Sequence, residues 1–238
     1  FSIRSFTFIT LYPQANPSMD YPGKVACTVF LPGCNLRCPF CHNPALVLPD
    51  RETDSLSTEE LLAFLETRRG KLDGVCVTGG EPTLYEDLPA LLRQIRALGF
   101  AVKLDTNGCD PARLAEILNQ GLVDYVAMDV KNAPARYAET VGIPGFNPAP
   151  VEESIRLLRK STVDYEFRTT LVRELHRPED LDAIAAWLAG APRYYLQNFV
   201  DSGNLIGRGY HGFTAEQLQG FAERVRPFFG AVELRGID

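Results

Sequence analysis

The feature that most constrains this chain is a regular alternation along its 238 residues. Short apolar runs with the length of buried strands alternate with stretches whose apolar residues recur at helical spacing. The predicted strands cover residues 25–31, 75–78, 100–105, 123–130, 163–172 and 194–198. Parallel neighbouring strands need crossover connections of this helical kind, and such connections are right-handed. The alternation therefore predicts an α/β fold with a parallel sheet.

The number of these units predicts how the sheet closes. A closed TIM barrel has eight units, so six units favour a curved, partly open (β/α)6 TIM-like barrel. A doubly wound flat sheet has the same local pattern and remains the alternative. With neither an internal repeat nor a linker in the sequence, we expect a single domain over residues 1–238. Within it we expect an N-terminal extension at 1–24, six β/α units at 25–212, and a C-terminal helix and tail at 213–238.

Capping residues mark where several helices begin. Ser57 with Glu60, and Thr214 with Gln217, have the spacing of capping boxes. Asp110, followed directly by proline, is typical of a helix N-terminus.

The charge balance narrows the function class. Lys and Arg number 24 against 30 Asp and Glu, a net charge of −6. This mildly acidic balance gives no support for nucleic-acid binding or for a membrane surface as partner. The sequence also contains no apolar run long enough to span a bilayer, so we expect a cytoplasmic protein. Three of the six cysteines fall within eight residues, which in such a protein points to metal binding.

These three cysteines are Cys34, Cys38 and Cys41, in a C-x3-C-x2-C spacing. One alternative is a helix that buries them as small apolar residues, but Pro39 within the segment disfavours a helix. A second alternative is structural zinc, which needs four ligands and would have to use His42, adjacent to Cys41. Three thiolates on a compact loop are instead suited to three irons of a [4Fe–4S] cluster, with the fourth iron open to a small molecule.

The cysteine segment resembles the signature of the radical S-adenosylmethionine superfamily, in which an aromatic residue, here Phe40, precedes the last cysteine. Gly79-Gly80-Glu81-Pro82, directly after the second predicted strand, is similar to the second motif of that superfamily. The resemblance implies a [4Fe–4S] cluster on the three cysteines and S-adenosylmethionine as cofactor. It also implies that the backbone of the second motif binds the methionyl amino group. Phe40 would pack beside the adenine or serve as a core aromatic.

Further polar residues fall at the carboxyl ends of the predicted strands, where a barrel places its active site. Asp105, Thr106 and Asn107 end the third strand, and Asp129 and Lys131 end the fourth. A cofactor with a carboxylate and a ribose needs a cation for the first and acceptors for the second, and these charged residues fit that need. A simple Asn-Gly turn at 105–108 and a solvated Asp129–Lys131 ion pair remain alternatives.

The fifth predicted strand carries a polar row on one face, made of Glu166, Arg168 and Thr170. Arg168 would contact the cofactor or form an interior ion pair with Glu166. Of the remaining cysteines, Cys27 and Cys76 are expected in the core, and Cys109 is expected to be exposed in a loop.

A closer resemblance is to the glycyl-radical-enzyme activating proteins, in particular those of anaerobic ribonucleoside-triphosphate reductase. It rests on four short segments: 20–24 (DYPGK), 41–44 (CHNP), 105–108 (DTNG) and 128–131 (MDVK). It implies cleavage of S-adenosylmethionine to a 5′-deoxyadenosyl radical that takes hydrogen from a glycine of a partner enzyme. The electron donor would be a flavodoxin or ferredoxin.

The same resemblance implies roles for individual residues. Lys131 would contact the cofactor and Asp20 would lie near the substrate. Asp105 and Asp129, with main-chain oxygens of Thr106 and Met128, would hold a monovalent cation. Two other functions remain alternatives. One is a radical enzyme acting on a small molecule or peptide, such as a 7-carboxy-7-deazaguanine synthase-like enzyme, and the other is a non-catalytic metal-binding module.

Overall fold

The computed structural model describes residues 8–11, 21–47 and 56–237. Its centre is one eight-stranded sheet in which the strands lie side by side in chain order. Strands β2 to β8 are parallel, and β1 pairs with β2 in the antiparallel direction. The strands are β1 (Phe8–Leu11), β2 (Ala26–Leu31), β3 (Gly74–Gly79), β4 (Ala101–Thr106), β5 (Tyr125–Asp129), β6 (Asp164–Leu171), β7 (Arg193–Asn198) and β8 (Ala231–Arg235).

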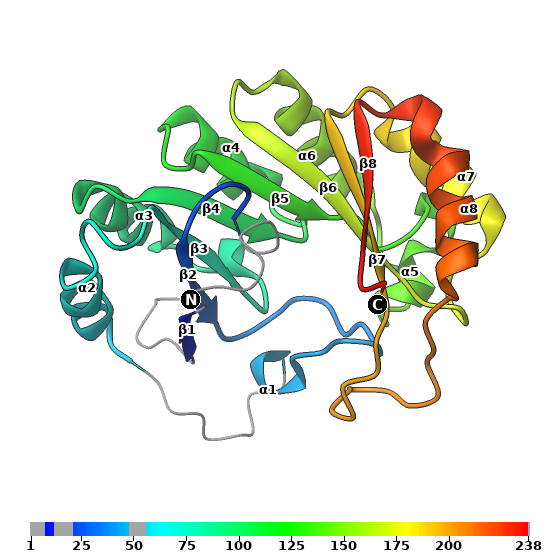
Figure 1. Cartoon of the computed structure of the whole chain (residues 1–238), viewed down its shortest axis with the longest axis horizontal. Coiled ribbons are helices and arrows are strands. Elements are labelled where there is room, and N and C mark those ends of the chain that lie inside the picture. Colours follow the sequence, from blue (N-terminus) through cyan, green and yellow to red (C-terminus); the bar gives the residue numbers. More distant parts are fainter. Residues whose placement is uncertain (1–7, 12–20, 48–55, 238) are drawn as a thin grey trace.

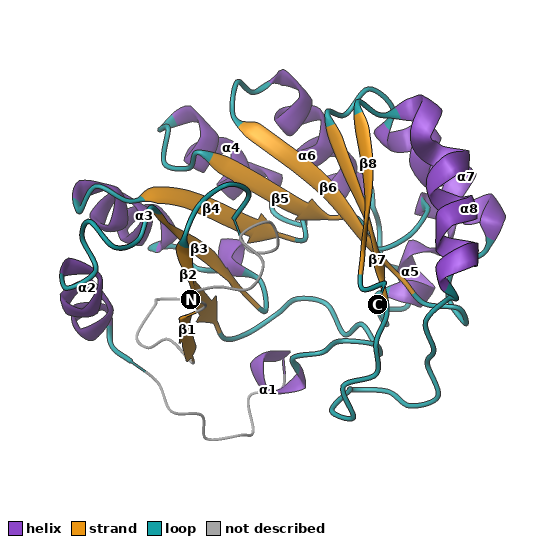
Figure 2. Cartoon of the chain, in the orientation of Figure 1, coloured by secondary structure: helices purple, strands orange, loops and turns teal. Residues whose placement is uncertain are grey.

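Helices follow the outer side of the sheet in an arc (Figures 1 and 2). They are α2 (Thr58–Glu66), α3 (Leu88–Ala97), α4 (Pro111–Asn119), α5 (Tyr137–Thr140), α6 (Ala149–Lys160), α7 (Pro178–Leu188) and α8 (Ala215–Val225). The short helix α1 (Pro44–Val47) lies apart from this arc, at the end of the loop that follows β2 (Figure 1). The predicted capping boxes at Ser57 and Thr214 are confirmed, and the Asp110 carboxylate accepts a hydrogen bond from the first turn of α4. These caps satisfy backbone N–H groups that have no partner within the helix.

The strand order excludes the doubly wound alternative. A doubly wound sheet reverses its strand order at a switch point, whereas this order is sequential from one edge to the other. The predicted partial TIM-like barrel is therefore confirmed, with seven parallel strands where the sequence predicts six.

Two strands lie outside the six predicted ones. β8 falls in the segment assigned to a tail, and β1 falls in the N-terminal extension. The β8 sequence, AVELR, is short and alternates apolar with charged residues, and none of its residues is fully buried. It therefore lacks the apolar run that marks a buried parallel strand, and only its pairing with β7 makes it a strand.

The two faces of the sheet differ in polarity. On β4, Val102 and Leu104 are completely buried on the outer face, toward the helices. Burial of each such side chain contributes roughly 1.5 to 3 kcal/mol of transfer free energy. Because side chains alternate along a strand, Lys103 and Asp105 lie on the inner face, and Arg168 on β6 does so as well. The barrel interior is therefore lined with charged groups.

Candidate active site

The three cysteines lie on a loop that follows β2, residues 32–43, which we call the cluster loop. The backbone N–H of Gly33 donates to the carbonyl of Leu46 (2.6 Å), and that of Arg37 donates to Val141 (2.9 Å). The Arg37 guanidinium donates back to the carbonyl of Cys34 at 2.7 Å. These contacts fix the loop backbone independently of any metal.

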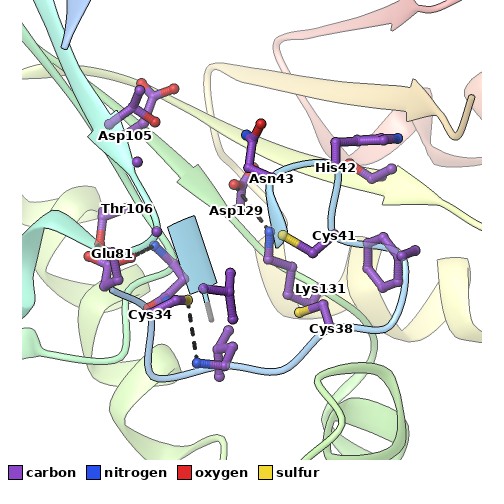
Figure 3. A pocket seen from close by; sticks show the side chains of 18 of the residues that line it. Cys34, Cys38, Cys41, His42, Asn43, Glu81, Asp105, Thr106, Asp129 and Lys131 are labelled. Carbon is purple, nitrogen blue, oxygen red and sulfur yellow. Dashed lines mark hydrogen bonds and ion pairs between the residues drawn. The ribbon is translucent and has the colours of Figure 1, made fainter. Parts of the chain in front are cut away.

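The thiols of Cys34, Cys38 and Cys41 line a pocket of about 230 Å³ at the carboxyl ends of the strands (Figure 3). Cys38 is 8% exposed, and burial raises the pKa of its thiol to about 12. Because burial disfavours the free thiolate, a bound metal is the natural partner for the ionised sulfur.

The geometry does not favour the zinc alternative. In the described ranges 8–11, 21–47 and 56–237, no three His, Cys, Asp or Glu side chains are placed to hold a metal ion together. His42 is engaged elsewhere: its Nε2 lies 2.8 Å from the carbonyl oxygen of Val200, and its ring stacks on Phe199. Three separate thiols without a fourth ligand fit a [4Fe–4S] cluster, in which each thiolate binds a different iron.

The second motif runs against the cluster loop. The N–H of Gly80 donates to the carbonyl of Leu31, and the N–H of Glu81 donates to the carbonyl of Gly33, both at 2.8 Å. A Cβ on Gly80 would lie 2.0 Å from that Gly33 oxygen. Only glycine permits this close approach, so the sequence Gly-Gly-Glu fixes the distance between the two motifs.

The buried Glu81 carboxylate joins two segments, the second motif and the end of β4. It accepts hydrogen bonds from the N–H and hydroxyl of Thr83 (3.1 and 2.6 Å), the hydroxyl of Thr106 (2.7 Å) and the N–H of Asn107 (2.6 Å). Burial raises the pKa of Glu81, and these four donors oppose that rise. The Asn107 amide in turn donates to Asn35 of the cluster loop at 2.8 Å. Glu81 therefore holds the end of β4 against the second motif.

The Asp129–Lys131 ion pair that the sequence suggests is formed, but it is mostly buried and not solvated. Lys131 Nζ lies 3.2 Å from the Asp129 carboxylate, and both side chains are at least three-quarters buried. Although burial favours the neutral amine, Asp129 holds the pKa of Lys131 above its usual value, so its charge is retained on the pocket wall. Arg168 binds Asp129 at 2.9 Å, while Glu166 accepts a hydrogen bond from Tyr125 at 2.7 Å. The interior pair Arg168–Glu166 is therefore not formed.

The pocket brings together the residues that the sequence picks out. Its lining includes Phe40, Gly79, Gly80, Glu81, Asp105, Thr106, Asn107, Asp129 and Lys131. Arg168 is not part of the lining, since its guanidinium lies between Asp105 and Asp129. Asp20 lies outside the described residues. Cofactor contact by the lining residues remains a prediction.

The pocket also contains residues that the sequence analysis misses. Gln197, at the end of β7, lines the pocket, and its amide donates to the hydroxyl of Thr170 at 3.2 Å. Gln197 could have been identified from the sequence as a polar residue at the carboxyl end of a predicted strand. Of the other cysteines, Cys27 and Cys76 are buried as predicted, whereas Cys109 is half-buried and not exposed.

The chain matches the radical SAM superfamily over residues 28–188, which contain both motifs, and it belongs to that superfamily. A Methanocaldococcus jannaschii protein provisionally named a glycyl-radical enzyme activating enzyme is 34% identical over 186 residues, covering 76% of each chain. The fold is similar to that of Streptococcus suis SuiB bound to S-adenosylmethionine, with a TM-score of 0.68 at 16% sequence identity. The match covers 88% of this chain and 52% of SuiB, so the chain spans about half the length of that protein.

A second solved structure, that of QueE from Escherichia coli, matches with a TM-score of 0.56 at 19% identity. The match covers 98% of this chain and 93% of QueE. Identities this low establish the fold alone. By its membership in the superfamily, the protein is a radical SAM enzyme, and its cofactors are a [4Fe–4S] cluster and S-adenosylmethionine. Among its described helices, none combines the length and apolar character needed to cross a membrane.

Proposed function

We propose that this enzyme activates a glycyl-radical enzyme by removing a hydrogen atom from the Cα of a glycine in that partner. Its particular target would be an anaerobic ribonucleoside-triphosphate reductase. The support is the provisional name of the Methanocaldococcus jannaschii relative, which is 34% identical, together with the four short segments described above.

The observation that carries the proposal is one pocket that holds three thiols, the second-motif backbone and a cationic lysine (Figure 3). In it, Cys34, Cys38 and Cys41 would hold the cluster, the backbone at Gly79–Gly80 would bind the cofactor amino group, and Lys131 would bind its carboxylate. When bound, the cluster and S-adenosylmethionine supply the radical chemistry: one electron cleaves the sulfonium into methionine and a 5′-deoxyadenosyl radical.

In the hydrogen-transfer step, the protein would only orient the reacting groups and exclude water. Transfer of a hydrogen atom from the glycine Cα yields 5′-deoxyadenosine and a glycyl radical, which the flanking amide nitrogen and carbonyl stabilise. No separate acid or base takes part. The protein needs a pocket that fixes the cofactor, and the wall opposite the cluster loop is built from strand ends, which are more rigid than loops.

The radical chemistry is tested on anaerobically reconstituted protein with dithionite and S-adenosylmethionine, by chromatography of 5′-deoxyadenosine. We expect product from the wild type and none from Cys34→Ala, Cys38→Ala or Cys41→Ala. Cys27→Ala is the matched control, since it removes a buried thiol outside the cluster loop. Retained cluster and activity in any of the three cluster-loop variants would contradict the assignment.

The target is tested separately, with candidate glycyl-radical enzymes labelled with [2-²H]glycine and with flavodoxin or ferredoxin as reductant. We expect an organic radical on the partner by electron paramagnetic resonance and deuterium in the 5′-deoxyadenosine. Cofactor cleavage without either signal, across the anaerobic reductases tried, would reject the glycyl proposal. It would favour the small-molecule or peptide alternative and leave the superfamily assignment intact.

A further inference from the structure

Each carboxylate oxygen of Asp105 and Asp129 lies beside a cationic side chain. In Asp105, one oxygen lies 2.5 Å from Lys103 Nζ and the other lies 2.9 Å from Arg168 Nη1. In Asp129, one oxygen lies 2.9 Å from Arg168 Nε and the other lies 3.2 Å from Lys131 Nζ. The single guanidinium of Arg168 therefore bridges the two carboxylates. We call these five residues the charge array.

Four members of the charge array lie on three adjacent strands, and Lys131 follows β5 by two residues. Asp129 of β5 and Arg168 of β6 are register partners, and β4 pairs with β5 on the other side. The side chains of Lys103, Arg168 and Asp105 are 0%, 10% and 13% exposed. Ion pairs that are this buried are only weakly screened by salt. The arrangement is thus fixed by the sheet and is not a mobile surface contact.

The charge balance of the array disfavours an additional cation. It has three cationic and two anionic side chains, so its net charge is already positive. Each carboxylate oxygen already faces an ammonium or guanidinium group, and an added monovalent cation would be repelled by the excess positive charge. The cation site that the family resemblance implies at Asp105 and Asp129 therefore does not fit these residues.

We propose that the Arg168 guanidinium takes the place of a monovalent cation in this enzyme. It bridges Asp105 and Asp129, holds Asp129 beside Lys131, and so positions the lysine that would face the cofactor carboxylate. Arg168 is a positioning residue, and S-adenosylmethionine binds without sodium or potassium. The inference rests on membership in the radical SAM superfamily and not on the identity of the substrate.

The test measures the affinity of the cluster-reconstituted wild type for S-adenosylmethionine by isothermal titration calorimetry. The titration is repeated at equal ionic strength in potassium, sodium and tetramethylammonium chloride, since the last cation is too large for a carboxylate site. We expect Kd values within twofold of one another. A tenfold weaker Kd in tetramethylammonium, about 1.4 kcal/mol, would overturn the proposal.

A variant tests the role of Arg168 itself. Arg168→Gln removes the bridge, so we expect its Kd to become at least fivefold tighter in potassium than in tetramethylammonium. Arg224→Gln is the matched control, since it breaks an exposed ion pair with Asp182 on the outer helices and should show no ion dependence. Equal affinity of Arg168→Gln in all three salts would overturn the proposed role. Circular dichroism checks its fold, and if it does not fold, the wild-type titrations decide.

Discussion

The imidazole of His42 stacks on the ring of Phe199, with centroids 5.2 Å apart and planes 13° from parallel. Its Nε2 also lies 2.8 Å from the carbonyl oxygen of Val200. A second link joins the same two loops, because the N–H of Gly207 donates to the carbonyl of Pro39 at 2.7 Å. The segment after β7 therefore supports the cluster loop on the side of Cys41.

Replacing His42 should loosen that support. His42→Ala removes the stacking and the hydrogen bond, and each is worth about 1 kcal/mol. We expect the reconstituted variant to lose its iron–sulfur absorbance several-fold faster in the presence of a chelator. His42→Phe keeps the stacking and should give an intermediate rate. An unchanged rate in His42→Ala would contradict this view of the loop.

Gly80→Ala should destabilise the protein strongly. The new Cβ would meet the backbone oxygen of Gly33 at 2.0 Å, and backbone cannot move away as a side chain can. We expect a loss of about 3 kcal/mol in the free energy of unfolding, measured by urea denaturation of the apoprotein. Gly220→Ala on α8 is the matched control: with open space around it, it should gain about 0.5 to 1 kcal/mol. A similar change in the free energy of unfolding for both variants would contradict this prediction, because it would mean that the backbone around Gly80 relieves the clash.

Glu81→Gln should separate the end of β4 from the second motif. Glutamine has one acceptor oxygen where the carboxylate has two, and its amide would face the N–H of Asn107 or of Thr83. We expect a loss of about 2 to 3 kcal/mol by urea denaturation, because a buried donor is left without a partner. Glu223→Gln, on the exposed side of α8, should stay within about 0.5 kcal/mol of the wild type. Equal stabilities of the two variants would refute this role of Glu81.

Acid should destabilise the charge array. Burial alone would raise the pKa of Asp129, but Arg168 and Lys131 bring it well below its usual value. A depressed pKa in the folded state means that the stabilisation is present above the unfolded pKa of about 4 and is lost as the pH falls below it. We expect the free energy of unfolding to decrease between about pH 5 and pH 3, by about 1.4 kcal/mol per pH unit for each extra proton bound on unfolding. Asp129→Asn should show a shallower decrease, and an identical slope would contradict the assignment.

Much of this protein is determined by local sequence. The apolar runs predict six of the strands, and the capping residues Ser57, Asp110 and Thr214 mark where their helices begin. The cysteine spacing and the Gly-Gly-Glu segment predict the site, because parallel strands bring their carboxyl ends to one edge. These features depend on residues a few positions apart, which the sequence shows directly.

Other features depend on contacts that the linear sequence does not contain. β8 is too short and polar to be predicted, and it becomes a strand only by pairing with β7. The bridge from Arg168 to both Asp105 and Asp129 requires the register of β5 and β6, whereas adjacency along β6 suggested Glu166 as the partner. The partners of His42 lie more than 150 residues further along the chain. The sequence determined most of the groups that line the pocket, although not Gln197, and the tertiary structure decided which of them bind one another, since that choice follows from strand register and loop packing.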